Sequence, residues 1–145
     1  MDLMRFLPVA QAIAGLSKDP AVQVGALVID DDANLISTGF NGFPRGVADS
    51  EHRLKSRELK LCFVVHAEAN AIAQAARTGA KTRGANLIVT ERYPCKSCAG
   101  IIIQAGIKRV YAPVMNATKT NRQWIDDKAF SSKMFAEAGV EVVEY

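Results

Sequence analysis

The sequence has little charge imbalance, no long apolar run and no leader pattern, and each shortage excludes a class of protein. Its 18 basic and 15 acidic side chains give a net charge of +3, scattered along the chain, which is too little for a nucleic-acid groove. The longest apolar run, 99–107, is interrupted by Gln104 and is far too short to span a membrane. Only Arg5 precedes the first apolar stretch, and no small-residue cleavage pattern follows it, so we expect no secretory signal. We therefore expect a cytoplasmic protein that binds neither nucleic acid nor membrane.

The chain also lacks a linker. No stretch rich in Pro, Gly or Ser and no block of like charge divides its 145 residues. Because 49% of these residues are hydrophobic, the chain has enough apolar material for one domain with a substantial core. We expect residues 1–145 to form a single domain.

Hydrophobic periodicity indicates alternating strands and helices. After an opening helix over 3–14, the runs Val24–Ile29 and Leu35–Phe40 flank an Asp-rich turn and predict a β-hairpin. Strands separated by helices imply crossovers and parallel pairing, so we predict an α/β fold whose mixed five-stranded sheet is covered on both faces. The remaining predicted helices are His66–Thr78, Cys95–Ala105 and Trp124–Ala138, and the remaining predicted strands are Asn86–Thr90, Arg109–Ala112 and Val140–Glu144.

A polar segment, 41–61, separates the hairpin from the first of these later helices. It is rich in Gly, Arg and Lys and shows no clear periodicity, which is typical of a functional loop, with room for a short helix around Glu51–Lys60. Its cations could pair with an anionic ligand, although a solvated basic face is the better interpretation for most of them. They are Arg45, Arg53, Lys55, Arg57 and Lys60.

Two short motifs stand where predicted helices begin, namely His66–Glu68 and Pro94–Cys98. One imidazole and two thiolates suit zinc, and three protein ligands leave one coordination position open, as in catalytic zinc sites. Helix N-termini also favour thiolates, through their unpaired N–H groups and the helix dipole. We predict one zinc ion per chain, bound by His66, Cys95 and Cys98.

Glu68 lies two residues beyond His66 and therefore points in a different direction. A carboxylate there can take a proton from a water molecule at the open position and deliver it to a ring nitrogen and a leaving amine. The pair His-x-Glu and Pro-Cys-x-x-Cys is the known signature of zinc nucleobase deaminases. The alternative is a structural zinc site in a non-catalytic interaction module, with His52 or Cys62 as the fourth ligand. Outside that alternative, Cys62 is expected to be a buried small hydrophobe.

Over most of its length the sequence resembles the deoxycytidylate deaminases of the cytidine deaminase superfamily. The zinc motifs are shared with cytidine, guanine and tRNA-adenosine deaminases, whereas the Ser-Lys-Asp-Pro and Asn-Gly-x-Pro stretches point more narrowly to deoxycytidylate. The segments that carry the resemblance are Ser17–Pro20, Gln23–Ala26, Gly39–Gly46, His66–Ile72, Pro94–Ala99 and Ile102–Lys108.

The resemblance implies a three-layer α/β/α sandwich of the cytidine deaminase type that hydrolyses dCMP to dUMP and ammonia. It also implies a homo-oligomer, often a hexamer, and possible regulation by dCTP and dTTP. Alternative substrates are cytidine or deoxycytidine, guanine and tRNA adenosine.

Four residues are predicted to contact the substrate. The resemblance implies that Asn41 binds the sugar, although a turn residue that caps its own backbone is the alternative, and that the backbone of Ala67 contacts the pyrimidine. Arg92 and Tyr93 directly precede the zinc loop, Pro94–Cys98, and are expected at the mouth of the pocket. The phosphate-binding cation is left open among Lys18, Arg45, Arg92 and Arg122.

Overall fold

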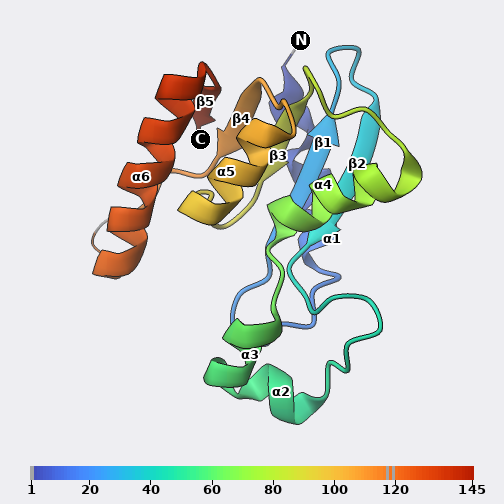
Figure 1. Cartoon of the computed structure of the whole chain (residues 1–145), viewed down its shortest axis with the longest axis vertical. Coiled ribbons are helices and arrows are strands. Elements are labelled where there is room, and N and C mark those ends of the chain that lie inside the picture. Colours follow the sequence, from blue (N-terminus) through green and yellow to red (C-terminus); the bar gives the residue numbers. More distant parts are fainter. Residues whose placement is uncertain (1, 117, 119) are drawn as a thin grey trace.

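The computed structural model describes residues 2–116, 118 and 120–145 and contains a five-stranded mixed sheet (Figure 1). The strand order is β2-β1-β3-β4-β5, in which β1 runs antiparallel to both of its neighbours and the pairs β3–β4 and β4–β5 are parallel. The predicted hairpin and mixed sheet are confirmed. The strands are β1 (Gly25–Ile29), β2 (Leu35–Phe40), β3 (Asn86–Val89), β4 (Arg109–Ala112) and β5 (Glu141–Glu144).

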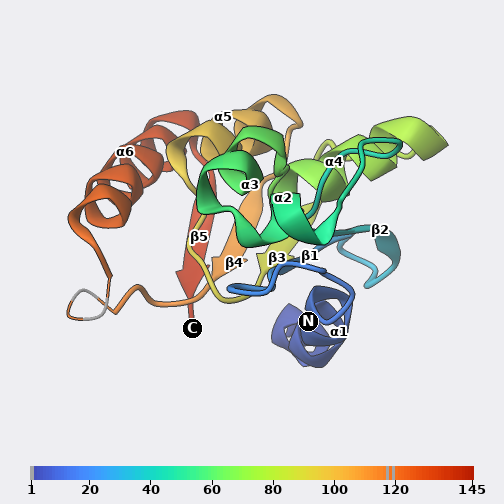
Figure 2. The same ribbon diagram turned by 90° about the horizontal axis from the view of Figure 1, so that it is seen from below.

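Helices cover both faces of the sheet, as Figure 2 shows. A 3-10 turn (Leu3–Phe6) and α1 (Leu7–Ala14) lie on one face, and α4 (Ala67–Thr78), α5 (Lys96–Gln104) and α6 (Arg122–Ala138) lie on the other. Alternate residues of the buried strand β1 supply the two cores, because successive strand side chains point to opposite faces. Ala26 and Val28 join the core under α4–α6, whereas Leu27 and Ile29 join the core under α1. The predicted three-layer α/β/α sandwich is therefore confirmed.

The segment between β2 and α4 forms an arm of two short helices that extends from one end of the sandwich (Figure 1). We predicted one short helix here, but the structure has α2 (Glu51–Lys55) and α3 (Arg57–Phe63). Ser56 separates them in an extended conformation and accepts a hydrogen bond from the Leu59 N–H, because serine is a favourable N-cap. Among the described residues, no helix combines the length and apolar character needed to cross a bilayer.

A close approach between β2 and α4 fixes the start of α4. A β-carbon at Gly39 would lie 2.3 Å from the Ala67 carbonyl oxygen, so only glycine allows this contact. Two residues earlier, the Ser37 hydroxyl donates to the Ala71 carbonyl at 2.8 Å. These contacts hold the first turns of α4 against the sheet, and His66 immediately precedes them.

Candidate active site

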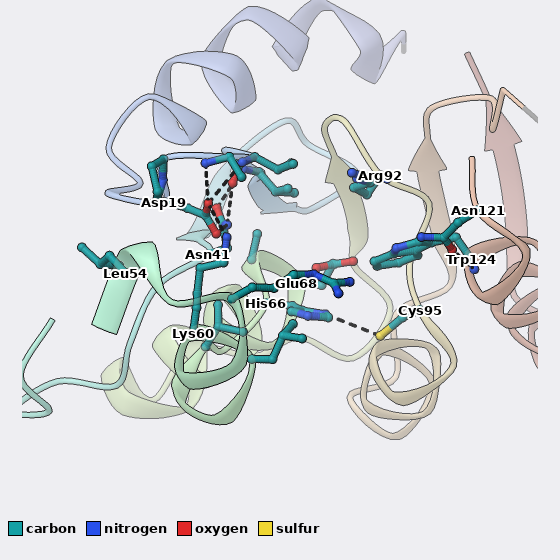
Figure 3. Close-up of a pocket in the computed structure, with 18 of the residues that line it drawn as sticks. Asp19, Asn41, Leu54, Lys60, His66, Glu68, Arg92, Cys95, Asn121 and Trp124 are labelled. Atoms are coloured by element: carbon teal, nitrogen blue, oxygen red, sulfur yellow. Dashed lines mark hydrogen bonds and ion pairs between the residues drawn. The ribbon is translucent and has the colours of Figure 1, made fainter. Parts of the chain in front are cut away.

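The three predicted zinc ligands lie together at the starts of α4 and α5. His66 is the N-cap of α4 and Cys95 is the N-cap of α5, both with extended backbone. The His66 Nδ1 atom is 3.5 Å from Cys95 Sγ and 3.5 Å from Cys98 Sγ, and Figure 3 shows the imidazole facing Cys95. All three ligand atoms lie within 4.8 Å of one another. The sequence motifs therefore converge on one point.

The spacing fits a tetrahedral zinc ion. Zn–N bonds of about 2.0–2.1 Å and Zn–S bonds of about 2.3 Å place N and S about 3.6 Å apart across a tetrahedral edge. This value agrees with both 3.5 Å separations in the structure. His66, Cys95 and Cys98 are thus positioned to hold the metal, with one tetrahedral position left over.

The two thiols influence each other's ionisation. The hydrogen bond from Cys98, together with His66, lowers the pKa of the Cys95 thiol to about 4. The pKa of Cys98 is raised, because its thiol donates a hydrogen bond to the Cys95 sulfur. Burial raises it further, since a second thiolate beside the first is disfavoured there. The neighbouring Cys95 sulfur raises the pKa of His66. A divalent cation between the two sulfurs would stabilise both as thiolates, since a thiol that coordinates a metal ion is deprotonated.

Glu68 lies in the first turn of α4 and is only 4% exposed. Burial raises the pKa of its carboxyl group to about 7. A carboxyl group with such a pKa can accept and return a proton near neutral pH. The structure therefore places a buried carboxyl group that titrates near neutral pH two residues from His66.

A cavity of about 600 Å³ opens beside this cluster. Its volume is within the range of sites that hold small molecules. His66, Glu68 and Cys95 contribute to its wall, and the fully buried Ala67 lines it as well. Its apolar wall includes Val22, Val24, Leu54 and Val64.

Asn41 lines the cavity, but its side-chain amide is already used within the chain. The Oδ1 atom accepts from the Val24 N–H at 2.8 Å, and Nδ2 donates to the Val22 carbonyl at 2.8 Å. Nδ2 also lies 3.4 Å from Asp19 Oδ2. The amide of Asn41 thus binds the backbone of the distant segment 22–24 and not its own turn, and the predicted sugar contact stays a prediction.

Arg92 and Tyr93 both line the cavity, in different ways. The Arg92 guanidinium lies 5.3 Å from the centre of the Trp124 ring. The Tyr93 ring is buried, and its hydroxyl lies 3.0 Å from the Ser132 hydroxyl on α6. Tyr93 therefore directs its polar atom toward α6, and its predicted substrate contact is untested.

Several cavity residues lie outside the predicted site. On the arm, the Lys60 ammonium is 3.0 Å from Asp19 Oδ1, and both side chains are largely buried. At the start of α6, Asn121 and Trp124 complete the opposite wall. No local motif surrounds these residues, although the single tryptophan near the start of a predicted helix was an available signal.

Of the four cations left open for the phosphate, only Arg92 lines this cavity among the described residues. The others have partners elsewhere: Lys18 pairs with Asp49, Arg45 donates to Gln74, and Arg122 pairs with Asp126.

A fourth protein ligand is absent from the described metal cluster. Within the described ranges, only His66, Cys95 and Cys98 form such a group, and neither His52 nor Cys62 joins it. Cys62 is exposed, so the expectation that it is buried was wrong. It lies on the short helix α3, which has no buried residues. The cluster thus has the open arrangement of a catalytic site.

The model of the family described as "Cytidine and deoxycytidylate deaminase zinc-binding region" matches residues 2–114. The chain belongs to the cytidine and deoxycytidylate deaminase family. This description and the clustered ligands confirm zinc as the cofactor. Helix α6 lies beyond the matched residues.

Two relatives and one solved structure illustrate membership of this deaminase family. An uncharacterized deaminase of Aliivibrio fischeri is 43% identical over 138 residues, which cover 95% of this chain and 89% of the relative. The deoxycytidylate deaminase of Homo sapiens is 39% identical over 113 residues, which cover 72% of this chain and 60% of that protein. The chain therefore spans about three fifths of the human relative's length.

The solved structure is that of dCMP deaminase from the cyanophage S-TIM5, in complex with dCMP and dUMP. It superposes with a TM-score of 0.74 at 25% identity, covering 97% of this chain and 94% of the phage chain. The likeness thus extends beyond the family-matched residues and includes α6.

Proposed function

We propose that this chain deaminates dCMP to dUMP and ammonia by zinc-dependent hydrolysis. The proposal is carried by the convergence of His66, Cys95 and Cys98 beside Glu68 in one cavity. Similarity to the human and phage enzymes favours dCMP over the other substrates of the family.

The chain's own residues then have distinct tasks. His66, Cys95 and Cys98 would hold a zinc ion, whose Lewis acidity would lower the pKa of a bound water molecule to about 7. Glu68 accepts a proton from the water as the water oxygen bonds to the ring carbon that carries the amino group, and it donates that proton to the adjacent ring nitrogen. Glu68 then passes the second proton of the water to the amino group, which leaves as ammonia as the C–N bond breaks and the ring carbonyl forms. The apolar wall excludes bulk water and holds the pyrimidine, while the backbone of Ala67 contacts its edge.

The test is a substrate comparison with one zinc-loaded preparation. We expect kcat/KM for dCMP to exceed the values for CMP, deoxycytidine, guanine and a tRNA anticodon stem. Glu68→Ala serves as the inactive control, so that any contaminating deaminase is detected. Higher efficiency on CMP, deoxycytidine, guanine or the tRNA stem than on dCMP would contradict the proposal.

We also propose that the active form is a homo-oligomer, with a hexamer as the favoured state. Ile101 on α5 is 42% exposed and Phe130 on α6 is 59% exposed, so these helices present apolar side chains outward. Sedimentation at micromolar concentration should give a species larger than a monomer. A clean monomer would contradict assembly.

We propose dCTP and dTTP as effectors of the same activity. Adding each to the dCMP assay below saturation should raise or lower the rate. Unchanged rates with both nucleotides would contradict this regulation.

A further inference from the structure

Arg92 is directed into the cavity by an unusual turn at the end of β3. Glu91, although not a glycine, has φ of 60°, in the left-handed region. The next N–H, that of Arg92, donates to the Thr90 carbonyl at 2.6 Å. Strained backbone of this kind persists where the surrounding structure holds it, and it often occurs at functional sites. Here it brings a guanidinium to the cavity wall.

Trp124 of α6 then fixes the position of that guanidinium. The Arg92 Cζ atom lies 5.3 Å from the Trp124 ring centre, within the range of a cation–π contact. Both side chains are half-buried, and both line the cavity. An arginine stacked in this way loses less conformational freedom when it binds an anion.

The other cations of the cavity are less suited to an anionic ligand. Lys60 is paired with Asp19 and Lys55 with Glu51. Arg57 is exposed at the start of α3, with no ring or carboxylate among the described residues that fixes it. Arg92 likewise forms no ion pair with a described carboxylate. It is therefore the half-buried cation of this wall whose charge stays available.

Arg92 and Asn41 lie on opposite sides of the catalytic residues. Figure 3 shows Asn41 with Asp19 and Lys60 on one side, Arg92 and Trp124 on the other, and His66 with Glu68 between them. In a nucleotide the 3′-hydroxyl and the 5′-carbon are attached to neighbouring ring atoms, C3′ and C4′, and point to opposite faces of the sugar. A base above the zinc ligands would allow the 3′ side to face Asn41 and the 5′ side to face Arg92.

We propose that Arg92, held by Trp124, binds the 5′-phosphate and sets the preference for a nucleoside monophosphate over a nucleoside. This inference rests on the proposed function. A guanidinium binds phosphate oxygens through parallel charge-assisted hydrogen bonds, which are about twice as strong as neutral ones. Because Trp124 lies beyond the family-matched residues 2–114, this preference depends on α6 as well as on the zinc motifs.

The test is the ratio of kcat/KM for dCMP to kcat/KM for deoxycytidine. Arg92→Gln should lower this ratio about 10- to 100-fold, because charged hydrogen bonds are lost, and it should leave deoxycytidine turnover within about threefold. Trp124→Leu should lower the ratio by a smaller factor, because the guanidinium stays but is no longer fixed. Arg122→Gln is the matched control, since this exposed arginine of α6 pairs with Asp126 outside the cavity.

Three results would overturn the inference. If Arg92→Gln lowers both efficiencies equally, Arg92 acts on the base or on folding instead. If Arg57→Gln lowers the ratio while Arg92→Gln does not, the phosphate is bound by Arg57 of the arm and not by Arg92. If neither variant changes the ratio, neither arginine binds it.

A binding measurement separates this inference from the proposed function. In a Glu68→Ala background, calorimetry should show that Arg92→Gln weakens dCMP binding about 10-fold or more and leaves deoxycytidine binding unchanged. If the wild type does not deaminate dCMP, the proposed function fails, and this binding comparison still decides the role of Arg92. Equal dCMP affinity with and without the arginine would overturn it.

Discussion

The Asp127 carboxylate on α6 accepts a hydrogen bond at 2.9 Å from the backbone N–H of Lys96, the first residue of α5. The first N–H groups of a helix have no partner within the helix, so this bond caps the helix that carries the zinc thiols. Within the same turn, the Cys98 N–H donates to Cys95 Sγ at 3.4 Å. The side chain of Asp127 is only 16% exposed. Helix α6 thus helps to orient the zinc loop.

Asp127→Ala should therefore accelerate zinc release. Outer groups that orient metal ligands typically contribute about 10-fold or more in metal affinity. Asp127→Asn keeps an oxygen acceptor for the Lys96 N–H and should recover most of the loss. The measurement is the rate at which zinc passes to a chromogenic chelator, with Asp126→Ala as the control because that exposed residue pairs with Arg122. Equal release rates for the two alanine variants would assign Asp127 a role in packing only.

Much of the fold was predictable because its signals are local. The hairpin strands, predicted at Val24–Ile29 and Leu35–Phe40, flank an Asp-rich turn. Glycines in the left-handed conformation, Gly79 and Gly139, end two of the helices. The zinc ligands were predictable for the same reason, since His66 and Cys95 each stand directly before a helix. Short-range chemistry therefore accounts for the sheet, the helices and the metal cluster.

The rest of the cavity depends on contacts between distant segments. Lys60 meets Asp19 across 41 positions of the sequence, and Lys96 meets Asp127 across 31. No periodicity or motif predicts such pairs. The partners of Asn41 could not be predicted from the local sequence either, because its amide binds the backbone of a segment about 20 residues away. The wall formed by α6 was missed because its residues match no deaminase motif.

Removing one thiol should remove the metal. Cys98→Ser leaves His66 and Cys95 with a poor third ligand, so zinc content should fall from one per chain to well below one. Because metal binding and folding are linked, the unfolding temperature should fall as well. Elemental analysis and thermal unfolding provide the measurements, and Cys62→Ser, at an exposed thiol of α3, is the control. Full zinc content in Cys98→Ser, or two zinc ions in the wild type, would contradict the predicted site.

Glu68→Gln should separate chemistry from binding. The amide has nearly the same size as the carboxylate but cannot carry the proton, so turnover should fall about 100- to 10,000-fold. Zinc content and dCMP affinity should stay close to those of the wild type, because Glu68 is not a predicted ligand. Steady-state kinetics, elemental analysis and calorimetry give the three values. Turnover within tenfold of the wild type would refute the proton-transfer role.

The Asp19–Lys60 pair joins the arm to the segment before β1, and it should contribute more to stability than a surface pair. Its side chains are 10% and 15% exposed, whereas those of Lys18 and Asp49 are 70% and 43% exposed. A double-mutant cycle with Asp19→Asn and Lys60→Met should give a coupling free energy of about 1–3 kcal/mol. The same cycle for Lys18 and Asp49 should give less than about 1 kcal/mol. Urea unfolding measures both, and equal couplings would contradict the difference in burial.

The stabilising effect of Asp19 should also depend on pH. Burial acts to raise the pKa of this carboxyl group, but hydrogen bonds from the Ala21 N–H, Lys60 and the Val22 N–H outweigh it, and the net pKa lies below the ordinary value of 3.8. A carboxyl group whose pKa is lower in the folded state stabilises the fold above its unfolded pKa, and this contribution is lost as the pH falls through the folded value. The free energy of unfolding should therefore differ between the wild type and Asp19→Asn by a constant amount near neutral pH. The difference should shrink only below about pH 4. A difference that already disappears between pH 7 and pH 5 would show that another group, and not Asp19, carries the stabilisation.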